Sequence, residues 1–137
     1  MIRSLAMKSS LSFAAIGLCL LASALPAGAH HSFDAEYDGN KPIVLTGIVT
    51  KVEWMNPHAR FYVDVKETNG SVTSWNLELG SPASLIRRGW TRHSLKVGDQ
   101  ITVKASLAKD GSKMANARSV TLADGTSVFG ASSADKE

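Results

Sequence analysis

The sequence predicts an all-β protein, an OB-like antiparallel barrel of five to six strands with one short helix. Two observations lead to this prediction. The elements follow the order of three meandering strands, one helix and two more strands, and the long first strand, residues 43–54, contains Gly47. A glycine inside a strand indicates tight curvature, a bulge or close backbone approach, which suits a strand that bends to serve both halves of a barrel. A β-sandwich is the main alternative, but it needs about seven strands and no helix at this point.

The second and third strands are predicted from the alternation of apolar and polar residues. Residues 59–66 and 72–79 each direct apolar side chains to one face, and Asn69-Gly70 between them favours a hairpin turn because both residues tolerate positive φ. The same alternation places Glu78 on the solvent face. Together with the next strand, it predicts a core that includes Phe61, Val63, Trp75, Leu77, Ile101 and Val103.

One short helix is predicted between the third and fourth strands. Ser81 is a favourable N-cap for a helix that begins with proline, and Gly89 is a typical C-terminal stop, so the helix is expected at residues 82–88. Leu85 and Ile86 are available for packing. Two further strands and a short terminal hairpin are expected at residues 100–107, 115–122 and 128–129.

Residues 1–29 have the layout of a secretory signal peptide: two basic residues, an apolar run and small residues before the cleavage point. We expect cleavage after Ala29; a buried N-terminal helix is the alternative. The apolar run is short for a membrane span, so we expect a periplasmic protein without a membrane anchor once the signal is removed. Cys19, the only cysteine, lies in this leader, so the mature chain would contain no thiol.

The rest of the chain divides into an N-terminal arm at residues 30–42, a barrel domain at residues 43–129 and a disordered tail at residues 130–137. The arm is expected to pack by Phe33 and Tyr37. Two of the 15 Lys and Arg residues lie in the leader, which leaves 13 against 12 Asp and Glu, a net charge of +1. This near-neutral charge argues against a nucleic-acid or anionic-membrane partner.

Several short motifs are specific in combination: His30-His31-Ser32-Phe33, Ala35-Glu36-Tyr37-Asp38, Val52-Glu53-Trp54, Asn56-Pro57-His58 and Arg87-Arg88-Gly89-Trp90. From residue 30 to about residue 122, this pattern resembles an exported bacterial family known only as a domain of unknown function. The resemblance implies a periplasmic domain without an established activity or ligand, and it assigns no catalytic role. More loosely, the barrel is similar to small periplasmic OB-fold proteins that bind ligands or partners.

The four histidines are the candidate metal ligands, and copper is the candidate metal. After cleavage at Ala29, the α-amine and ring of His30 could chelate one ion, with His58 or His93 as a third nitrogen ligand and His31 beside them. Copper suits such a set because it leads the affinity order of the divalent metals and accepts planar nitrogen geometry. Cleavage after residue 27 would instead give a histidine at the third position, which also binds copper. The alternative is an exposed, functionless pair at the terminus, with His58 bracing its loop.

A second candidate site is a binding groove lined by Trp54, Trp90, Tyr62 and Arg60. OB-folds that bind single strands stack bases on aromatic side chains in a basic groove. Here acidic residues are interleaved with the basic ones, and the tryptophans could instead plug the ends of the barrel. A single-stranded nucleic-acid binder is therefore the disfavoured alternative.

Motifs for catalysis are not visible in the sequence: no paired carboxylates, no nucleophile elbow and no phosphate-binding glycine loop. We therefore expect a non-catalytic periplasmic binding or interaction module, whose partner is a protein or a small ligand. The copper-binding protein described above is the alternative function.

Overall fold

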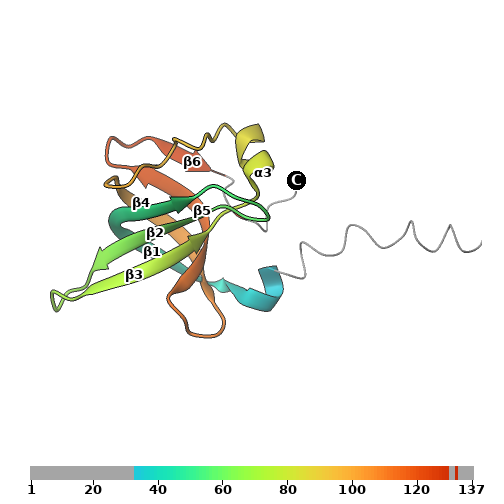
Figure 1. Ribbon diagram of the computed structural model, residues 1–137. Coiled ribbons are helices and arrows are strands. Elements are labelled where there is room, and N and C mark those ends of the chain that lie inside the picture. Colours follow the sequence, from blue (N-terminus) through green and yellow to red (C-terminus); the bar gives the residue numbers. More distant parts are fainter. Residues whose placement is uncertain (1–32, 130–131, 133–137) are drawn as a thin grey trace, which may run out of the picture.

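The computed structural model describes residues 33–129 and residue 132. Over these described residues, six strands follow one another, with a short helix between the third and the fourth (Figure 1). They are β1 (Tyr37–Glu53), β2 (Arg60–Lys66), β3 (Val72–Glu78), α3 (Pro82–Arg87), β4 (Gln100–Ala108), β5 (Met114–Leu122) and β6 (Ser127–Phe129). This order of elements confirms the predicted all-β class with one helix.

The strands form one sheet in the order β3-β2-β1-β4-β5-β6, and a further pairing of β3 with β5 closes it into a barrel. All neighbours in that order are antiparallel. The closing pair is parallel: residues 76–78 of β3 run alongside residues 114–116 of β5. The predicted OB-like barrel is thus present, with one parallel seam where a wholly antiparallel barrel was expected.

The first strand bends at the predicted glycine. A Cβ atom on Gly47 would lie only 2.2 Å from the carbonyl oxygen of Asp64 and 2.7 Å from Val63 Cγ1. At this point β1 stops pairing with β4 alone and begins to pair with β2. Gly47 therefore permits the close backbone approach that lets one strand serve both halves of the barrel.

The core fills the inside of the barrel as the alternation predicted. All six predicted core residues are buried, and Leu85 of α3 packs with them. Ile86, which was expected to pack as well, is 59% exposed, because its neighbour Leu85 occupies the inward face of this short helix. The helix begins as predicted: the Ser81 side chain accepts a hydrogen bond from the Ser84 N–H at 3.2 Å.

The segment before the barrel differs from the predicted arm. Residues 33–36 form a helical turn, and β1 already begins at Tyr37, so residues 37–42 belong to the first strand. Phe33 and Tyr37 are both buried, with ring centroids 5.6 Å apart, which confirms that the aromatics pack. The turn signal at residues 38–40 becomes an irregularity within the strand, where Asn40 N–H donates to Asp38 Oδ1.

The C-terminal segment contributes one described residue to the fold. Ser132 is only 3% exposed, although it falls in the segment that was predicted to be disordered. It donates a hydrogen bond to Asn116 Oδ1 at 2.6 Å, and this contact holds it against β5. Within residues 33–129 and 132, no helix is long and apolar enough to cross a bilayer.

Candidate functional site

The most unusual side chain in the described part of the protein is Glu78, at the end of β3. It was predicted to face solvent, but Glu78 as a whole residue is only 3% exposed. The alternation itself is correct, since Trp75 and Leu77 point into the core. Glu78 lies on the outer face of the sheet, where Tyr37 and Asn116 contact it across the barrel seam and contribute to its burial. A buried carboxylate is costly unless hydrogen-bonding partners replace its water.

Three side chains donate hydrogen bonds to the carboxylate and a fourth, His58, lies close to it. With Glu78 they form what we call the Glu78 cluster: Tyr37, His58, Arg60, Glu78 and Asn116. Glu78 Oε2 accepts hydrogen bonds from Arg60 Nη2 at 2.6 Å and from Tyr37 Oη at 3.1 Å. Glu78 Oε1 lies 3.4 Å from Asn116 Nδ2 and 3.3 Å from His58 Nδ1. Both carboxylate oxygens are therefore engaged by donors.

The topology of the barrel assembles the Glu78 cluster from four separate parts of the chain. Arg60 faces Glu78 across the β2–β3 hairpin, and Asn116 faces it across the parallel seam. Tyr37 is the first residue of β1 and reaches over the same seam. The hairpin register and the closure of the barrel thus bring these side chains together.

His58 is placed by the backbone of the loop between β1 and β2. The next residue, Ala59, donates its N–H to the Gly80 carbonyl at 3.0 Å and accepts from the Leu79 N–H at 2.9 Å. These two bonds tie the end of the loop to the chain just beyond Glu78. His58 follows the cis peptide bond Asn56-Pro57, and its side chain remains 28% exposed.

The surroundings of the Glu78 cluster reinforce it. Arg60 Nη1 also donates to Asn76 Oδ1 at 3.2 Å, which fixes the guanidinium over two positions of β3. Burial, followed by the nearby charge of Glu78, raises the pKa of the Tyr37 phenol well above its usual range. Tyr37 therefore stays protonated and remains a hydrogen-bond donor at physiological pH.

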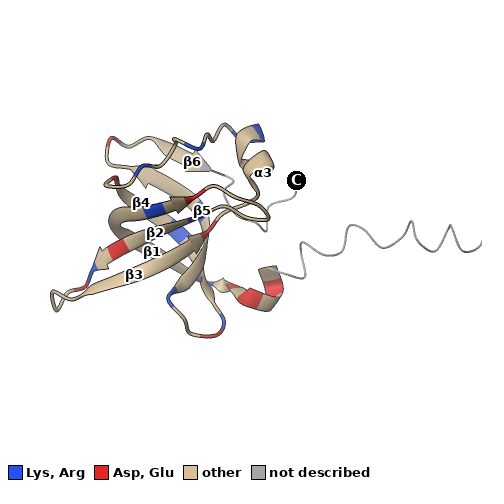
Figure 2. Cartoon of the chain, viewed as in Figure 1, with Lys and Arg blue, Asp and Glu red and all other residues tan. Residues whose placement is uncertain are grey.

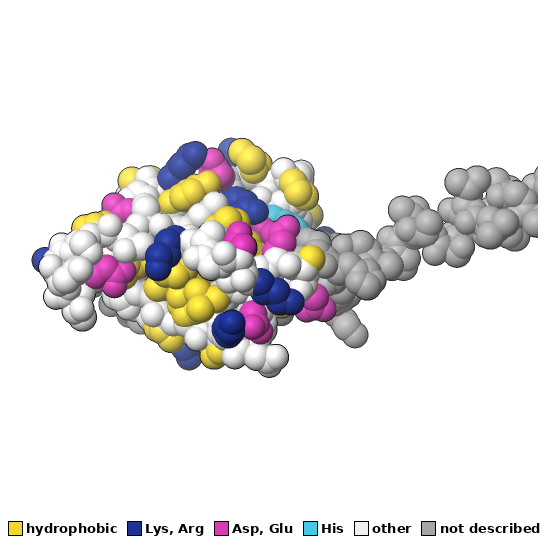
Figure 3. Space-filling view, turned by 90° about the horizontal axis from the view of Figure 1, so that it is seen from below, with side chains coloured by type: hydrophobic (Ala, Val, Ile, Leu, Met, Phe, Trp, Pro, Cys, Tyr) yellow, Lys and Arg dark blue, Asp and Glu magenta, His cyan; other side chains and the backbone are white. Residues whose placement is uncertain are grey.

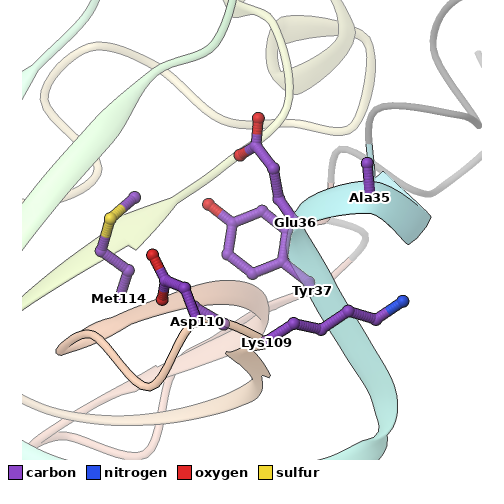
Figure 4. A pocket seen from close by; sticks show the side chains of 7 residues that line it. Ala35, Glu36, Tyr37, Lys109, Asp110 and Met114 are labelled. Atoms are coloured by element: carbon purple, nitrogen blue, oxygen red, sulfur yellow. The ribbon is translucent and has the colours of Figure 1, made fainter.

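A hollow of about 400 Å³ adjoins the Glu78 cluster (Figure 4). Tyr37 belongs to both, because its ring lines the hollow while its hydroxyl donates to Glu78. The remaining walls come from the helical turn and from the β4–β5 turn: Ala35, Glu36, Ala108, Lys109, Asp110 and Met114. The hollow thus lies next to a nearly buried side chain, 1% exposed, that is hydrogen-bonded directly to the buried carboxylate.

The charge that the hollow presents is mainly negative. In Figure 4 Lys109 extends away from the Tyr37 ring, and its ammonium donates to the Asp34 carbonyl. Glu36 and Asp110 lie on either side of that ring. Hydrogen bonds from Ser112 lower the pKa of Asp110, so this carboxylate is ionised at neutral pH. Apolar walls and two carboxylates suit a small cation with a short hydrocarbon body.

The predicted metal ligands are only partly described. His58 joins the Glu78 cluster, whereas His93 is exposed in the connector between α3 and β4. His30 and His31 lie outside the described residues. Within the described ranges, no three His, Cys, Asp or Glu side chains gather in a way that could hold a metal ion.

The predicted groove is not assembled as expected. Trp90 is 2% exposed and belongs to the core, so it does not line a surface. Trp54 is partly buried against the core. Tyr62 lies under the ammonium of Lys51, 5.2 Å from its ring centroid, and donates to Glu53. Arg60 is committed to the Glu78 cluster, so the four residues are divided between separate environments.

His58 and Arg60 were predicted from the sequence as members of two separate sites, whereas Glu78, Tyr37 and Asn116 were not predicted as site residues. One available signal was the hairpin register. A turn centred on Asn69 places Arg60 directly opposite Glu78, as the structure has it. The hydrogen bonds from Tyr37 and Asn116 to Glu78 depend on the closure of the barrel, so no local pattern in the sequence indicates them.

The fold and the Glu78 cluster define a small OB-like barrel domain with a polar site where the barrel closes. The chain belongs to the family of unknown function DUF6152, whose family model matches residues 17–117. The described motif residues Tyr37 and His58 both fall within that match and within the cluster.

Comparison with solved structures finds the mitochondrial single-stranded DNA-binding protein Rim1 from S. cerevisiae. The sequences are 9% identical, and the TM-score is 0.48 over 61% of this chain and 93% of that chain. No curated protein matches the chain.

Proposed function

We propose that this protein is an exported, non-catalytic binding module of the periplasm, and that its ligand site is the hollow beside the Glu78 cluster. The observation that supports this most is the double role of Tyr37. Its ring lines the hollow, and its hydroxyl donates to the buried Glu78 at 3.1 Å. Tyr37 is itself only 1% exposed, so a ligand in the hollow would lie against a wall that the hydrogen-bonded network holds in place, and a preorganised wall favours selective binding.

The ligand class follows from the walls of the hollow. Glu36 and Asp110 supply negative charge, and Met114 with two alanines supplies apolar contact. These features fit a small aliphatic amine: the ammonium group meets the carboxylates, and the hydrocarbon part meets the thioether and methyl groups. An anionic ligand would meet repulsion from both carboxylates.

A titration followed by amide NMR tests this proposal, with 1,4-diaminobutane as the probe and uncharged 1,4-butanediol as its matched control. We expect the diamine to shift the signals of Tyr37 and Asp110, and the diol to leave them unchanged. Asp110→Asn should weaken binding about fivefold, since one charge interaction at ~4 Å in water is worth ~1 kcal/mol.

Asp124→Asn is the matched control variant. Like Asp110, Asp124 precedes a glycine in a turn and accepts a backbone hydrogen bond two residues on, but it lies away from the hollow. Equal weakening by both substitutions, or equal shifts with the diol, would mean that the diamine does not use the hollow.

The second candidate function is Cu(II) binding through the amine and ring of His30 after signal cleavage, with His58 as third ligand. One contact favours His58 over His93 for this role. Glu78 Oε1 lies 3.3 Å from His58 Nδ1, and metal-ligating histidines are commonly oriented by a carboxylate at the other ring nitrogen. His93 is exposed and forms no ion pair with a carboxylate among residues 33–129 and 132.

Calorimetry and electron paramagnetic resonance with Cu(II) would compare three forms: the mature protein beginning at His30, the same protein with an added N-terminal Met, and His58→Ala. The added Met should weaken binding because it removes the chelate formed by the terminal amine. Affinity should fall as the pH drops toward 5, since the nitrogens must lose their protons to bind. Unchanged affinity with the added Met would contradict the role of the amine.

A further inference from the structure

The turn between β2 and β3 contains the tripeptide Asn69-Gly70-Ser71, in which a serine follows an asparagine by two positions. The order Asn-x-Ser or Asn-x-Thr, where x is not proline, is the acceptor pattern for N-linked oligosaccharides, and it belongs on a surface loop of an exported protein. The chain has five asparagines, and Asn69 is the only one that stands in this pattern. The pattern therefore marks a single position.

The surface at this turn has room for a bulky group. Residues 66–72 are all exposed. A Cβ atom on Gly70 would meet no other atom of the described residues within 4 Å. Figure 1 shows the turn projecting from the body of the barrel, apart from the β4–β5 turn that walls the hollow. An oligosaccharide on Asn69 could thus extend into solvent without covering the hollow.

The side chain of Asn69 leaves its amide nitrogen available. Asn69 Oδ1 accepts two hydrogen bonds from Ser71, one from Oγ at 2.7 Å and one from the backbone N–H at 2.9 Å. Because a backbone N–H can only donate, the amide atom that it meets must be the oxygen. Nδ2 is then the other atom, and no residue among 33–129 and 132 accepts a hydrogen bond from it.

The tip of the hairpin is also independent of the barrel. Glu67 N–H donates to the Ser71 carbonyl at 2.8 Å, and Gly70 N–H donates to the Glu67 carbonyl at 2.9 Å. With the two bonds to Asn69, these hydrogen bonds join members of residues 67–71 only to one another. The tip can therefore change its shape in the active site of an enzyme without breaking a hydrogen bond to the barrel.

We propose that Asn69 is the acceptor of an N-linked oligosaccharide, which an oligosaccharyltransferase transfers from a lipid diphosphate after export. Asn69 Nδ2 forms a bond to the anomeric carbon of the sugar, and the bond between that carbon and the diphosphate oxygen breaks. The lipid diphosphate leaves with the electron pair, and Nδ2 gives up one proton to a base of the transferase. The proposal rests on the export step of the proposed function, and it needs neither the hollow nor copper.

Mass spectrometry of protein isolated from the periplasm of its own bacterium tests the proposal. We expect the tryptic peptide of residues 67–87 to carry the additional mass of an oligosaccharide, and fragmentation to locate that mass on Asn69. Asn76 in the same peptide is the internal control, because it lies outside the acceptor pattern. A chain that begins at His30 with this peptide unmodified, or with the sugar on Asn76, would overturn the acceptor role and leave export intact. An unmodified peptide in a chain that retains the leader would overturn both.

Three variants produced in the same bacterium test the pattern itself. Asn69→Gln removes the acceptor nitrogen from its position, and Ser71→Ala removes the hydroxyl, so both should lose the oligosaccharide. Ser71→Thr keeps the hydroxyl and should retain it. All three should fold as the unmodified protein does, because the tip makes its hydrogen bonds within itself, and circular dichroism checks this. Sugar that persists in Ser71→Ala or in Asn69→Gln would overturn the assignment to this site.

Discussion

Arg60 and Glu78 face each other across the β2–β3 hairpin, and Arg60 Nη2 lies 2.6 Å from Glu78 Oε2. The two side chains differ in exposure: that of Arg60 is 26% exposed and that of Glu78 only 5%. The ion pair therefore joins a partly exposed arginine to a buried carboxylate at the seam where β3 meets β5. Its value to the fold lies in neutralising a carboxylate that other residues have covered.

Removing Arg60 should destabilise the protein more than removing an exposed arginine. Arg60→Ala leaves the buried Glu78 without its cation, and breaking such a pair costs about 3 kcal/mol. Arg92→Ala, at an exposed position, should change the free energy of unfolding by less than about 0.5 kcal/mol. Urea unfolding of both variants measures the difference in their free energies of unfolding. Equal values for the two variants would show that the buried Glu78 does not need Arg60 as its counter-charge.

Tyr37 should make the protein sensitive to alkali. Its pKa is raised in the folded state, chiefly by burial and then by the charge of Glu78, so folding favours the protonated phenol. This contribution is fully present below the unfolded pKa of about 10 and is lost as the pH rises above it.

The free energy of unfolding of Tyr37→Phe should therefore decline less steeply above about pH 10 than that of the unmodified protein. At neutral pH it should be about 2 kcal/mol less stable, the usual value of a hydrogen bond to a charged acceptor. Tyr62→Phe is the control and should retain the alkaline loss. Thermal unfolding across this pH range provides the measurement, and parallel curves for all three proteins would contradict the expectation.

Gly47 should tolerate no larger residue. In Gly47→Ala the new Cβ would lie 2.2 Å from a backbone oxygen of β2, which cannot move without disturbing the sheet, and we expect a loss of about 3 kcal/mol. Gly39→Ala is the matched control in the same strand, since its nearest neighbour would be Arg118 Nη2 at 3.6 Å. Its stability should stay within about 0.5 kcal/mol of the parent. Similar losses for both would mean that the close approach at Gly47 is absent in solution.

Export should leave His30 as the first residue. Intact-mass analysis of protein recovered from the periplasm of an expressing bacterium should correspond to cleavage after Ala29. A mass that retains residues 1–29 would contradict both the export signal and the terminal copper ligand. A mass that corresponds to a chain beginning at Gly28 would instead favour the alternative copper site, in which the histidine is the third residue of the mature chain.

Single-stranded nucleic acid should not bind usefully. Trp90 is buried, and Arg60 is paired with Glu78. Figure 2 shows both basic and acidic positions on the strands and loops, and the face seen in Figure 3 carries the two kinds interspersed. Fluorescence titration with an oligonucleotide at ~150 mM salt, where exposed charges are screened, should show no submicromolar binding. Binding in that range would mean that the remaining surface aromatics suffice for stacking.

The fold was accessible from the sequence because its signals are local. The Asn69-Gly70 turn, the Ser81 cap and the strand alternation each depend on neighbouring residues, and each is present as predicted. The start of β1 was missed because residues 38–40 combine turn-forming side chains with sheet pairing at one irregular position. At these residues the pairing of β1 with β4 outweighs the local preference of the side chains for a turn.

The site was less accessible because its burial is a long-range property. Alternation correctly places Glu78 on the outer face of β3, but the exposure of that face is decided by Tyr37 and Asn116, about forty positions away on either side. His58 was recognisable as a functional candidate from its loop. Its link to a buried carboxylate required the Ala59 backbone bonds and the closed barrel.

The parallel seam also governs how the chain reaches its final shape. Residues 76–78 pair with residues 114–116, so the barrel can close only when two segments some 38 positions apart in the sequence come into contact. Such closure is entropically slow and belongs late in folding. Until then residues 76–78 of β3 and residues 114–116 of β5 each have an unpaired edge that is able to pair with another molecule. A chain that ended before β5 would leave this edge of β3 unpaired, so we expect such a truncated chain to self-associate more readily than the full chain.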